Sequence, residues 1–199
     1  MSDPTTFILA VLALLATPGP TNTLVAASGA ARGVGRSLRL VPAELSGYLL
    51  SIIGLITLAG PLVAAYPMVA VGLKLVAGLW LGCCALCLWR GNASSDEADP
   101  ARISARRVFV TTALNPKALV FALVIIPQGS LGQTMPWLAG FSVMVILVAM
   151  AWIAFGAMVA RSAGHLATPR RISRAAALVL AVFAMVIAGA AIAAVVYPK

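Results

Sequence analysis

The sequence is poor in acidic residues and in histidine. Its 199 residues include 5 Asp and Glu and 1 His, against 14 Lys and Arg. A metal centre or an acid–base active site needs several converging carboxylates, imidazoles or thiolates. The sequence contains no pattern of a metal cluster, a phosphate-binding loop or a paired nucleophile and base. It therefore predicts neither an enzyme nor a bound metal or other cofactor.

Cysteine is also scarce, and the three that occur lie together. Cys83, Cys84 and Cys87 form a C-C-x-x-C pattern in one apolar run. This spacing is similar to that of a redox dithiol, but no second set of thiols is available to relay electrons. We favour a packing role, because free cysteine behaves as a small apolar side chain. A membrane thiol-disulfide electron carrier is the alternative, and it would require Cys84 and Cys87.

Charge of either sign is rare over the whole chain, in which 10% of residues are charged and 62% are hydrophobic. Soluble domains are about half apolar and about a quarter charged. With a mean hydropathy of +1.04, the chain is predicted to be an all-α integral membrane protein. Six apolar runs, each long enough to span a bilayer, lie near residues 6–27, 40–65, 67–89, 108–128, 136–160 and 175–197.

The net charge of +9 comes from basic residues in short stretches between the apolar runs. This pattern is typical of cytoplasmic loops and not of a nucleic-acid-binding surface. The eleven arginines fall near residues 32–39, 90–107 and 161–174. The positive-inside rule puts these stretches in the cytoplasm and both termini outside it. We expect a multi-pass protein of the bacterial inner membrane, with a first run that is kept as a helix because no positive region of a secretory signal precedes it.

Proline interrupts two of the apolar runs. The first break is Thr17-Pro18-Gly19-Pro20-Thr21-Asn22, and the second is Asn115-Pro116-Lys117. Proline removes a backbone donor, which in the first break should free the carbonyls of Leu14 and Ala16. Freed backbone at this depth is tolerated only where protein buries it or a cavity meets it. Two interrupted spans at matching places indicate a transporter's binding site; the alternative is that the prolines only kink the helices for packing.

Three spans in each half would make the two halves enter the membrane in opposite directions. We therefore predict one domain, residues 1–199, with six transmembrane helices arranged as two inverted three-helix repeats. The repeats cover about residues 1–90 and 107–199, and the first helix of each is broken at proline. A flexible linker is predicted near residues 91–106, since its first part is small, polar and acidic. The inversion allows the two breaks to face each other, and the sequence is also compatible with a homo-oligomer.

Both breaks offer polar groups to a ligand. Asn115 before Pro116 has the pattern of a helix N-cap with proline at the first helical position, and the first break could begin a half helix in the same way. The amides at such N-termini attract anions, for instance a substrate carboxylate. The predicted substrate site consists of Thr17, Pro18, Gly19, Pro20, Thr21, Asn22, Lys74, Asn115, Pro116 and Lys117.

Lysine occurs at two places within the apolar runs, where a charge costs a few kcal/mol unless it faces protein or water. Lys117 directly follows the second break, and we expect it to bind the substrate carboxylate. Lys74 precedes Gly78 and Gly82 at helical spacing, a small-residue packing pattern that predicts a helix contact on this face. The alternative for Lys74 is that its ammonium extends to the outer membrane interface.

Glu44 is the only acidic residue within an apolar run. Gly47, Tyr48 and Ser51 share its helical face, and this makes Glu44 the candidate proton carrier. The alternative is that Glu44 lies near the arginine stretch and forms a salt bridge with Arg36 or Arg39. The sequence does not choose between these two roles.

The order of these motifs resembles the LysE/RhtB family of amino-acid exporters over nearly the whole chain. The resemblance implies a six-helix exporter of amino acids or their derivatives, driven by the proton motive force. Thr21, Pro42, Ala177 and Ala184 depart from the family pattern and leave the substrate and the coupling ion open. A membrane assembly subunit that transports nothing is a further hypothesis. The matching stretches are Thr17-Pro18-Gly19-Pro20-Thr21-Asn22 with Ser28-Gly29, Leu73-Lys74-Leu75-Val76-Ala77-Gly78 with Leu81-Gly82, and Leu114-Asn115-Pro116-Lys117-Ala118 with Pro127-Gln128.

The predicted topology can be tested by labelling single cysteines introduced into a cysteine-free variant. Reagents that do not cross the membrane should reach cysteines near residue 132 from outside. Cysteines near residues 96 and 165 should react only after the membrane is made permeable, because the arginine stretches hold these loops in the cytoplasm. Labelling near residue 96 from outside would contradict both the topology and the direction of export.

Overall fold

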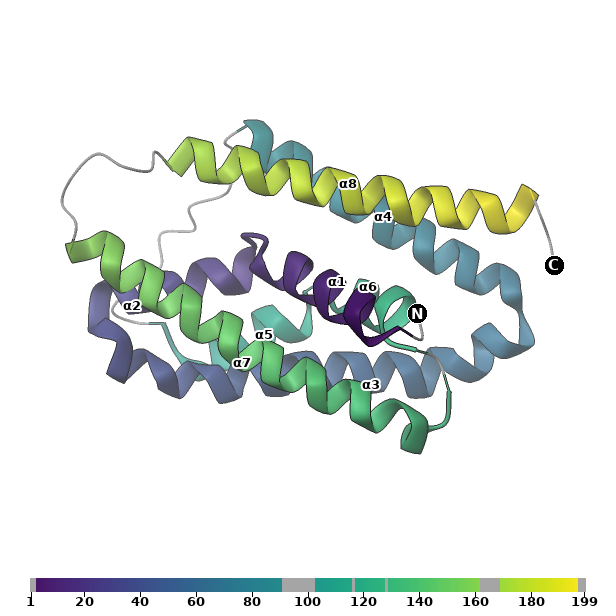
Figure 1. The fold of residues 1–199 in the computed structure, drawn as a ribbon, viewed down its shortest axis with the longest axis horizontal. Coiled ribbons are helices and arrows are strands. Elements are labelled where there is room, and N and C mark those ends of the chain that lie inside the picture. The colour runs from purple at the N-terminus through teal and green to yellow at the C-terminus, as the bar shows by residue number, and fades with distance from the viewer. Residues whose placement is uncertain (1–2, 91–102, 116, 128, 162–168, 197–199) are drawn as a thin grey trace.

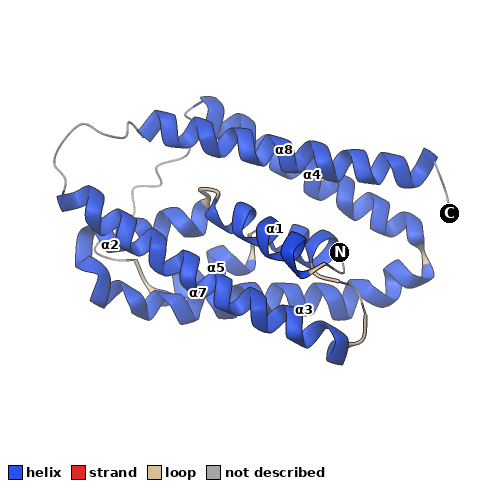
Figure 2. Ribbon diagram, in the orientation of Figure 1, coloured by secondary structure: helices blue, strands red, loops and turns tan. Residues whose placement is uncertain are grey.

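The computed structural model describes residues 3–90, 103–115, 117–127, 129–161 and 169–196. All regular elements in these ranges are helical, as Figure 2 shows by colour. The predicted all-α class is therefore confirmed for the described part of the chain. In chain order (Figure 1) the elements are α1 (Pro4–Ala16), α2 (Pro20–Ser37), the 3-10 turn η1 (Leu38–Leu40), α3 (Val41–Ala65), α4 (Pro67–Arg90), α5 (Ala105–Ala113), α6 (Lys117–Val120), the π-helical turn η3 (Phe121–Ile125), α7 (Leu131–Arg161) and α8 (Pro169–Val196).

Proline begins several of these helices, and a polar cap precedes the first of them. The Asp3 carboxylate accepts hydrogen bonds from the Thr6 amide at 2.7 Å and the Thr6 hydroxyl at 2.6 Å, ahead of Pro4 in the first turn of α1. These bonds hold the pKa of Asp3 below its ordinary value. Gly19 is the N-cap of α2, and Pro20 opens that helix. Because α1 ends at Ala16 and α2 starts anew, the first break separates two helices and is not a simple kink.

The helices long and apolar enough to cross a membrane are fewer than the six predicted spans. By length and composition, such stretches within the described residues are Pro20–Leu58 and Gly132–Arg161. The pair Ala105–Ala113 and Lys117–Ile125, which bends by 50°, would make a third span if counted as one. At 13 residues, α1 alone is shorter than the roughly 20 residues a span needs.

The first stretch of arginines lies on a helix, although the sequence predicts a loop there. α2 continues to Ser37, ten residues past the predicted end of the first run, and so includes Arg32 and Arg36. Gly33 interrupts its regular geometry with φ 76°, a left-handed conformation that glycine adopts without steric cost. At the other end of the chain, α7 begins at Leu131 and includes Pro136, at which the prediction starts this span.

Two helix pairs approach each other through glycine. A Cβ atom on Gly29 of α2 would lie 2.1 Å from the Ile153 carbonyl oxygen of α7, and one on Gly156 of α7 would lie 1.9 Å from the Ala26 carbonyl oxygen. This reciprocal contact lets two backbones meet directly, as small residues do in membrane helix pairs. In the same way Gly47 brings α3 against α5, where its Cβ would meet the Phe109 carbonyl oxygen at 2.8 Å.

The third close pair is α4 with α8, which run side by side along the top of Figure 1. A Cβ on Gly78 would lie 3.4 Å from the Ala184 carbonyl oxygen, which confirms the predicted small-residue contact at this position. Gly82 also faces α8, but no described atom would lie within 4 Å of a Cβ on it.

Aromatic side chains fill the core between α3, η3 and α7. Tyr48, Phe121 and Phe141 are fully buried and pack edge to face, with ring centroids 4.8 to 5.8 Å apart. Phe7 of α1 packs on Trp137 of α7 in the same way at 4.8 Å. These contacts fix α1, which precedes the first break, and η3, which follows the second break, against the longer helices.

The glycine crossing of α2 and α7 can be tested with two substitutions on one helix. Gly156→Ala should destabilise the protein by about 1–3 kcal/mol, because the added methyl group overpacks a backbone contact. Gly140→Ala, where a Cβ has no neighbour within 4 Å, should be neutral or stabilise by up to about 1 kcal/mol through helix propensity. Thermal unfolding in detergent measures both, and equal melting temperatures for the two variants would contradict the crossing.

Candidate functional site

The two proline breaks lie against each other inside the protein. The Lys117 ammonium donates a hydrogen bond to the Thr17 carbonyl oxygen at 2.5 Å. The Asn115 side-chain amide donates to the Thr21 hydroxyl at 3.3 Å. The predicted meeting of the two breaks is confirmed, and all four residues are buried.

The first break is supported by a side chain of its own. The Asn22 amide nitrogen donates to the Leu15 carbonyl at 2.7 Å and to the Thr17 carbonyl at 2.9 Å. The last carbonyls of any helix lack hydrogen-bond donors within that helix. Here the Asn22 amide is the donor for these two carbonyls. The Leu15 and Thr17 carbonyls that it serves lie beside those of Leu14 and Ala16, which the prolines are predicted to free.

Lys117 is a buried cation beside the C-terminal end of α1. Its side chain is 4% exposed. The carbonyl end of a helix carries partial negative charge, so the position of the ammonium at Thr17 offsets part of the cost of its burial. A Cβ on Gly19 would lie 3.3 Å from both Cε and Nζ of Lys117. Gly19 therefore leaves the room that lets the lysine reach the first break.

The second break is capped as its sequence predicts. The Asn115 side-chain oxygen accepts a hydrogen bond from the Lys117 backbone amide at 3.0 Å, and its backbone carbonyl accepts one from the Ala118 amide at 2.9 Å. Across the break, the Ser51 hydroxyl of α3 donates to the Ala113 carbonyl near the end of α5. Pro116 lies outside the described residues.

Thr112 joins the two breaks but was missed by sequence reasoning. Its hydroxyl oxygen lies 3.1 Å from that of Thr21 and 2.8 Å from the Val108 carbonyl oxygen, and the side chain is completely buried. The available signal was a hydroxyl residue one helical turn before Asn115 in an apolar run. Thr112 thus extends the buried polar residues of the two breaks into α5. We call this group the polar cluster, which consists of Thr17, Thr21, Asn22, Thr112, Asn115 and Lys117.

Glu44 lies in the protein interior, with 1% of its surface exposed. Within the described residues, its Oε2 atom has no hydrogen-bond partner. Arg36 and Arg39 are exposed and make no described ion pair with it, so the salt-bridge alternative is wrong. The positive charge of Lys117 acts on the Glu44 carboxyl group. The sequence prediction of an inward face is confirmed by Tyr48, which is buried one turn further along α3.

Arg32, which the sequence predicts to lie in a loop, belongs to α2 and makes specific hydrogen bonds. Its guanidinium donates to the Ser28 hydroxyl at 2.8 Å and to the Ile103 carbonyl at 2.7 Å. The Ser28 hydroxyl also lies 2.7 Å from that of Ser37. These hydrogen bonds tie α2 to the segment that leads into α5.

Several predicted residues are described only in part. The Lys74 backbone belongs to α4, but its side chain lies outside the described residues, as do those of Cys84 and Cys87. Cys83 is a free, exposed thiol. The described residues hold no group of three or more His, Cys, Asp or Glu side chains that could bind a metal ion.

A protein-family model described as LysE type translocator matches residues 12–197. This match covers both breaks and every described residue of the polar cluster. Comparison with curated proteins found no match, and neither did comparison with solved structures.

Proposed function

The chain belongs to the LysE type translocator family of membrane transporters, and we propose that it exports amino acids or amino-acid derivatives in exchange for protons. The observation that carries this proposal is the buried Lys117 ammonium, held where two broken helices meet. A cation fixed at such a junction suits a substrate that carries a carboxylate.

We further propose six spans in the bacterial inner membrane, arranged as two inverted repeats with both termini outside the cytoplasm. Several contacts between the halves support this arrangement. The break after α1 faces the break after α5, and the last helices of the two halves, α4 and α8, pack together. In the first half, α1 and α2 contact α7, the helix that follows the broken pair of the second half. In the same way α5 and α6 contact α3, the helix that follows the broken pair of the first half. An exchange of the two halves would preserve these pairings, as an inverted repeat requires.

In the proposed site the substrate carboxylate binds Lys117, next to the positively polarised N-terminus of α2. Thr21 and Asn115, which now bond to each other, would hydrogen-bond the other polar groups of the substrate. Asn22 was expected to act as a ligand too, but its amide nitrogen already serves two carbonyls of the first break. We therefore assign Asn22 to positioning the break.

Glu44 is the proposed proton carrier. A buried carboxyl group with one oxygen unpartnered among the described residues can bind and release a proton without the loss of a salt bridge. Lys117 acts on it electrostatically. An event at the lysine, such as arrival of a substrate carboxylate, would therefore change how readily Glu44 holds its proton.

The role of Lys117 is tested by Lys117→Met, which keeps the length and apolar stem but removes the charge. A lost charge-assisted hydrogen bond is worth about 1.5–3 kcal/mol, so substrate affinity should fall by about 10-fold to 150-fold. Pro116→Ala should instead reduce the transport rate by closing the break while the charge remains. Transport in proteoliposomes measures both effects, and unchanged affinity and rate for Lys117→Met would rule out carboxylate binding by the lysine.

The role of Glu44 is tested by Glu44→Gln, which preserves shape but cannot release a proton. Efflux driven by a pH gradient should be lost, whereas exchange of labelled for unlabelled substrate without a gradient should continue. Glu97→Gln, in the linker, is the control for removal of an acidic charge and should keep both activities. If Glu44→Gln still couples substrate movement to the pH gradient, another group carries the proton.

A further inference from the structure

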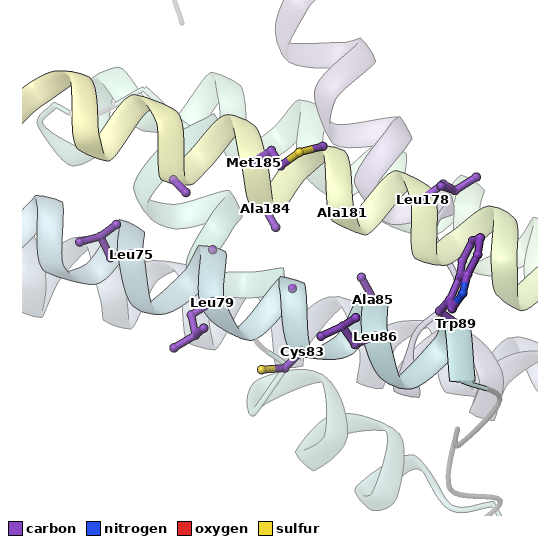
Figure 3. A pocket seen from close by; sticks show the side chains of 13 residues that line it. Leu75, Leu79, Cys83, Ala85, Leu86, Trp89, Leu178, Ala181, Ala184 and Met185 are labelled. Carbon is purple, nitrogen blue, oxygen red and sulfur yellow. The ribbon is translucent and has the colours of Figure 1, made fainter.

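Two hollows of different character lie along α4. The larger, of about 710 Å³, runs between α4 and α8. Figure 3 shows it lined by side chains such as Leu75, Leu178 and Met185, and Cys83 is also part of its lining. It shares no residue with the polar cluster. An apolar groove of this kind on a membrane protein says nothing about the substrate.

The smaller hollow, of about 340 Å³, lies beside the second break. It is lined by Ser51 and Leu55 of α3, by Val76 and Trp80 of α4, and by the residues from Ala113 to Asn115 together with Ala118 and Leu119. Small-molecule pockets measure about 300–1,000 Å³, so this pocket suits a ligand of amino-acid size. We refer to it as the break pocket.

Asn115 belongs to both the break pocket and the polar cluster. It lines the pocket, while its side-chain amide bonds to Thr21 and its side-chain oxygen accepts from the Lys117 amide. A ligand in the pocket therefore adjoins the residue that caps the helix bearing Lys117. Asn115 is thus the residue that the break pocket shares with the proposed substrate site.

The lining of the break pocket also determines which side chain it can accept. The residues that the structure describes in this lining include no charged one. Its two polar members are already engaged, since Ser51 donates to the Ala113 carbonyl and Asn115 caps the second break. A charged substrate side chain would find no counter-ion in this lining, and an unpaired charge in an apolar pocket is strongly disfavoured. Leucine, valine and tryptophan side chains instead offer contact to an apolar group.

From these observations we infer that the break pocket receives the side chain of the substrate, and that the exported substrates are amino acids with large apolar side chains. This inference rests on the proposed function, because it assumes that the substrate carboxylate lies at Lys117. In the bound state the carboxylate meets the lysine, the polar groups near Asn115 orient the substrate, and the aliphatic or aromatic group fills the pocket toward α4.

The test compares two variants of α4 in proteoliposomes. Val76→Phe should fill the pocket from its rim, where Val76 is 60% exposed and the larger side chain need not disturb the fold. Leu79→Phe is the matched control, because Leu79 is similarly exposed at 72% but lines the α4–α8 groove. The substrates are L-leucine, L-phenylalanine, L-alanine, L-lysine and L-glutamate.

The unmodified protein should transport leucine and phenylalanine in preference to lysine and glutamate. Val76→Phe should raise the KM for leucine and phenylalanine by about 10-fold or more, the discrimination that a few methylene groups provide. The KM for alanine should change by less than about twofold, and Leu79→Phe should leave all values unchanged. Trp80→Ala opens the pocket instead of filling it. This variant should also raise the KM for leucine more than the KM for alanine.

Two results would overturn the inference and leave the proposed function intact. One is a preference for lysine or glutamate, and the other is a Val76→Phe effect that is equal for alanine and leucine. The second result would mean that the pocket does not receive the substrate side chain. Failure to transport any of the amino acids, with the protein inserted and folded, would instead overturn the proposed function and the inference with it.

Discussion

A buried ammonium group needs oxygen atoms around it, and in this protein the end of a broken helix provides them. Lys117 reaches the Thr17 carbonyl at the C-terminal end of α1, where the helix dipole favours a cation. If α1 and α2 formed one continuous helix, that carbonyl would be bonded within the helix and closed to the lysine. The first break thus creates the partner that the charge after the second break requires. Each break therefore helps to bury polar groups of the other in an apolar environment.

The remaining features of the centre follow from this pairing. Asn22 and Ser51 satisfy carbonyls that the two breaks leave open, and Gly19 clears the path for the lysine stem. The long helices are fixed around the centre by backbone contacts, of which the α2–α7 crossing at Gly29 and Gly156 is the closest. The polar junction is therefore surrounded by packed helices. A substrate could replace some of the hydrogen bonds within this polar junction. Its binding would then disturb the junction more than the helices around it.

Much of this centre could be predicted because proline and charge are unusual in apolar runs. The breaks, the Asn115 cap and the inward face of Glu44 all followed from single residues in a hydrophobic background. Thr112 could not be found in this way, since a threonine in a membrane helix usually bonds to its own backbone. Its second contact, with Thr21, depends on the approach of two distant segments. The course of α2 through the arginines was also missed, because the pattern of charge predicts the side of the membrane and not the helix boundary.

The central claim is that Lys117 exchanges its contact with the Thr17 carbonyl for one with the substrate carboxylate. The most direct measurement is solid-state NMR of the reconstituted protein, with ¹⁵N in the lysine ammonium groups and ¹³C in the carboxyl group of a transported amino acid. The account predicts a dipolar coupling at hydrogen-bond range between the bound carboxylate and one lysine nitrogen, which disappears in Lys117→Met. A coupling that persists in this variant, or an occupied site without any such coupling, would contradict it.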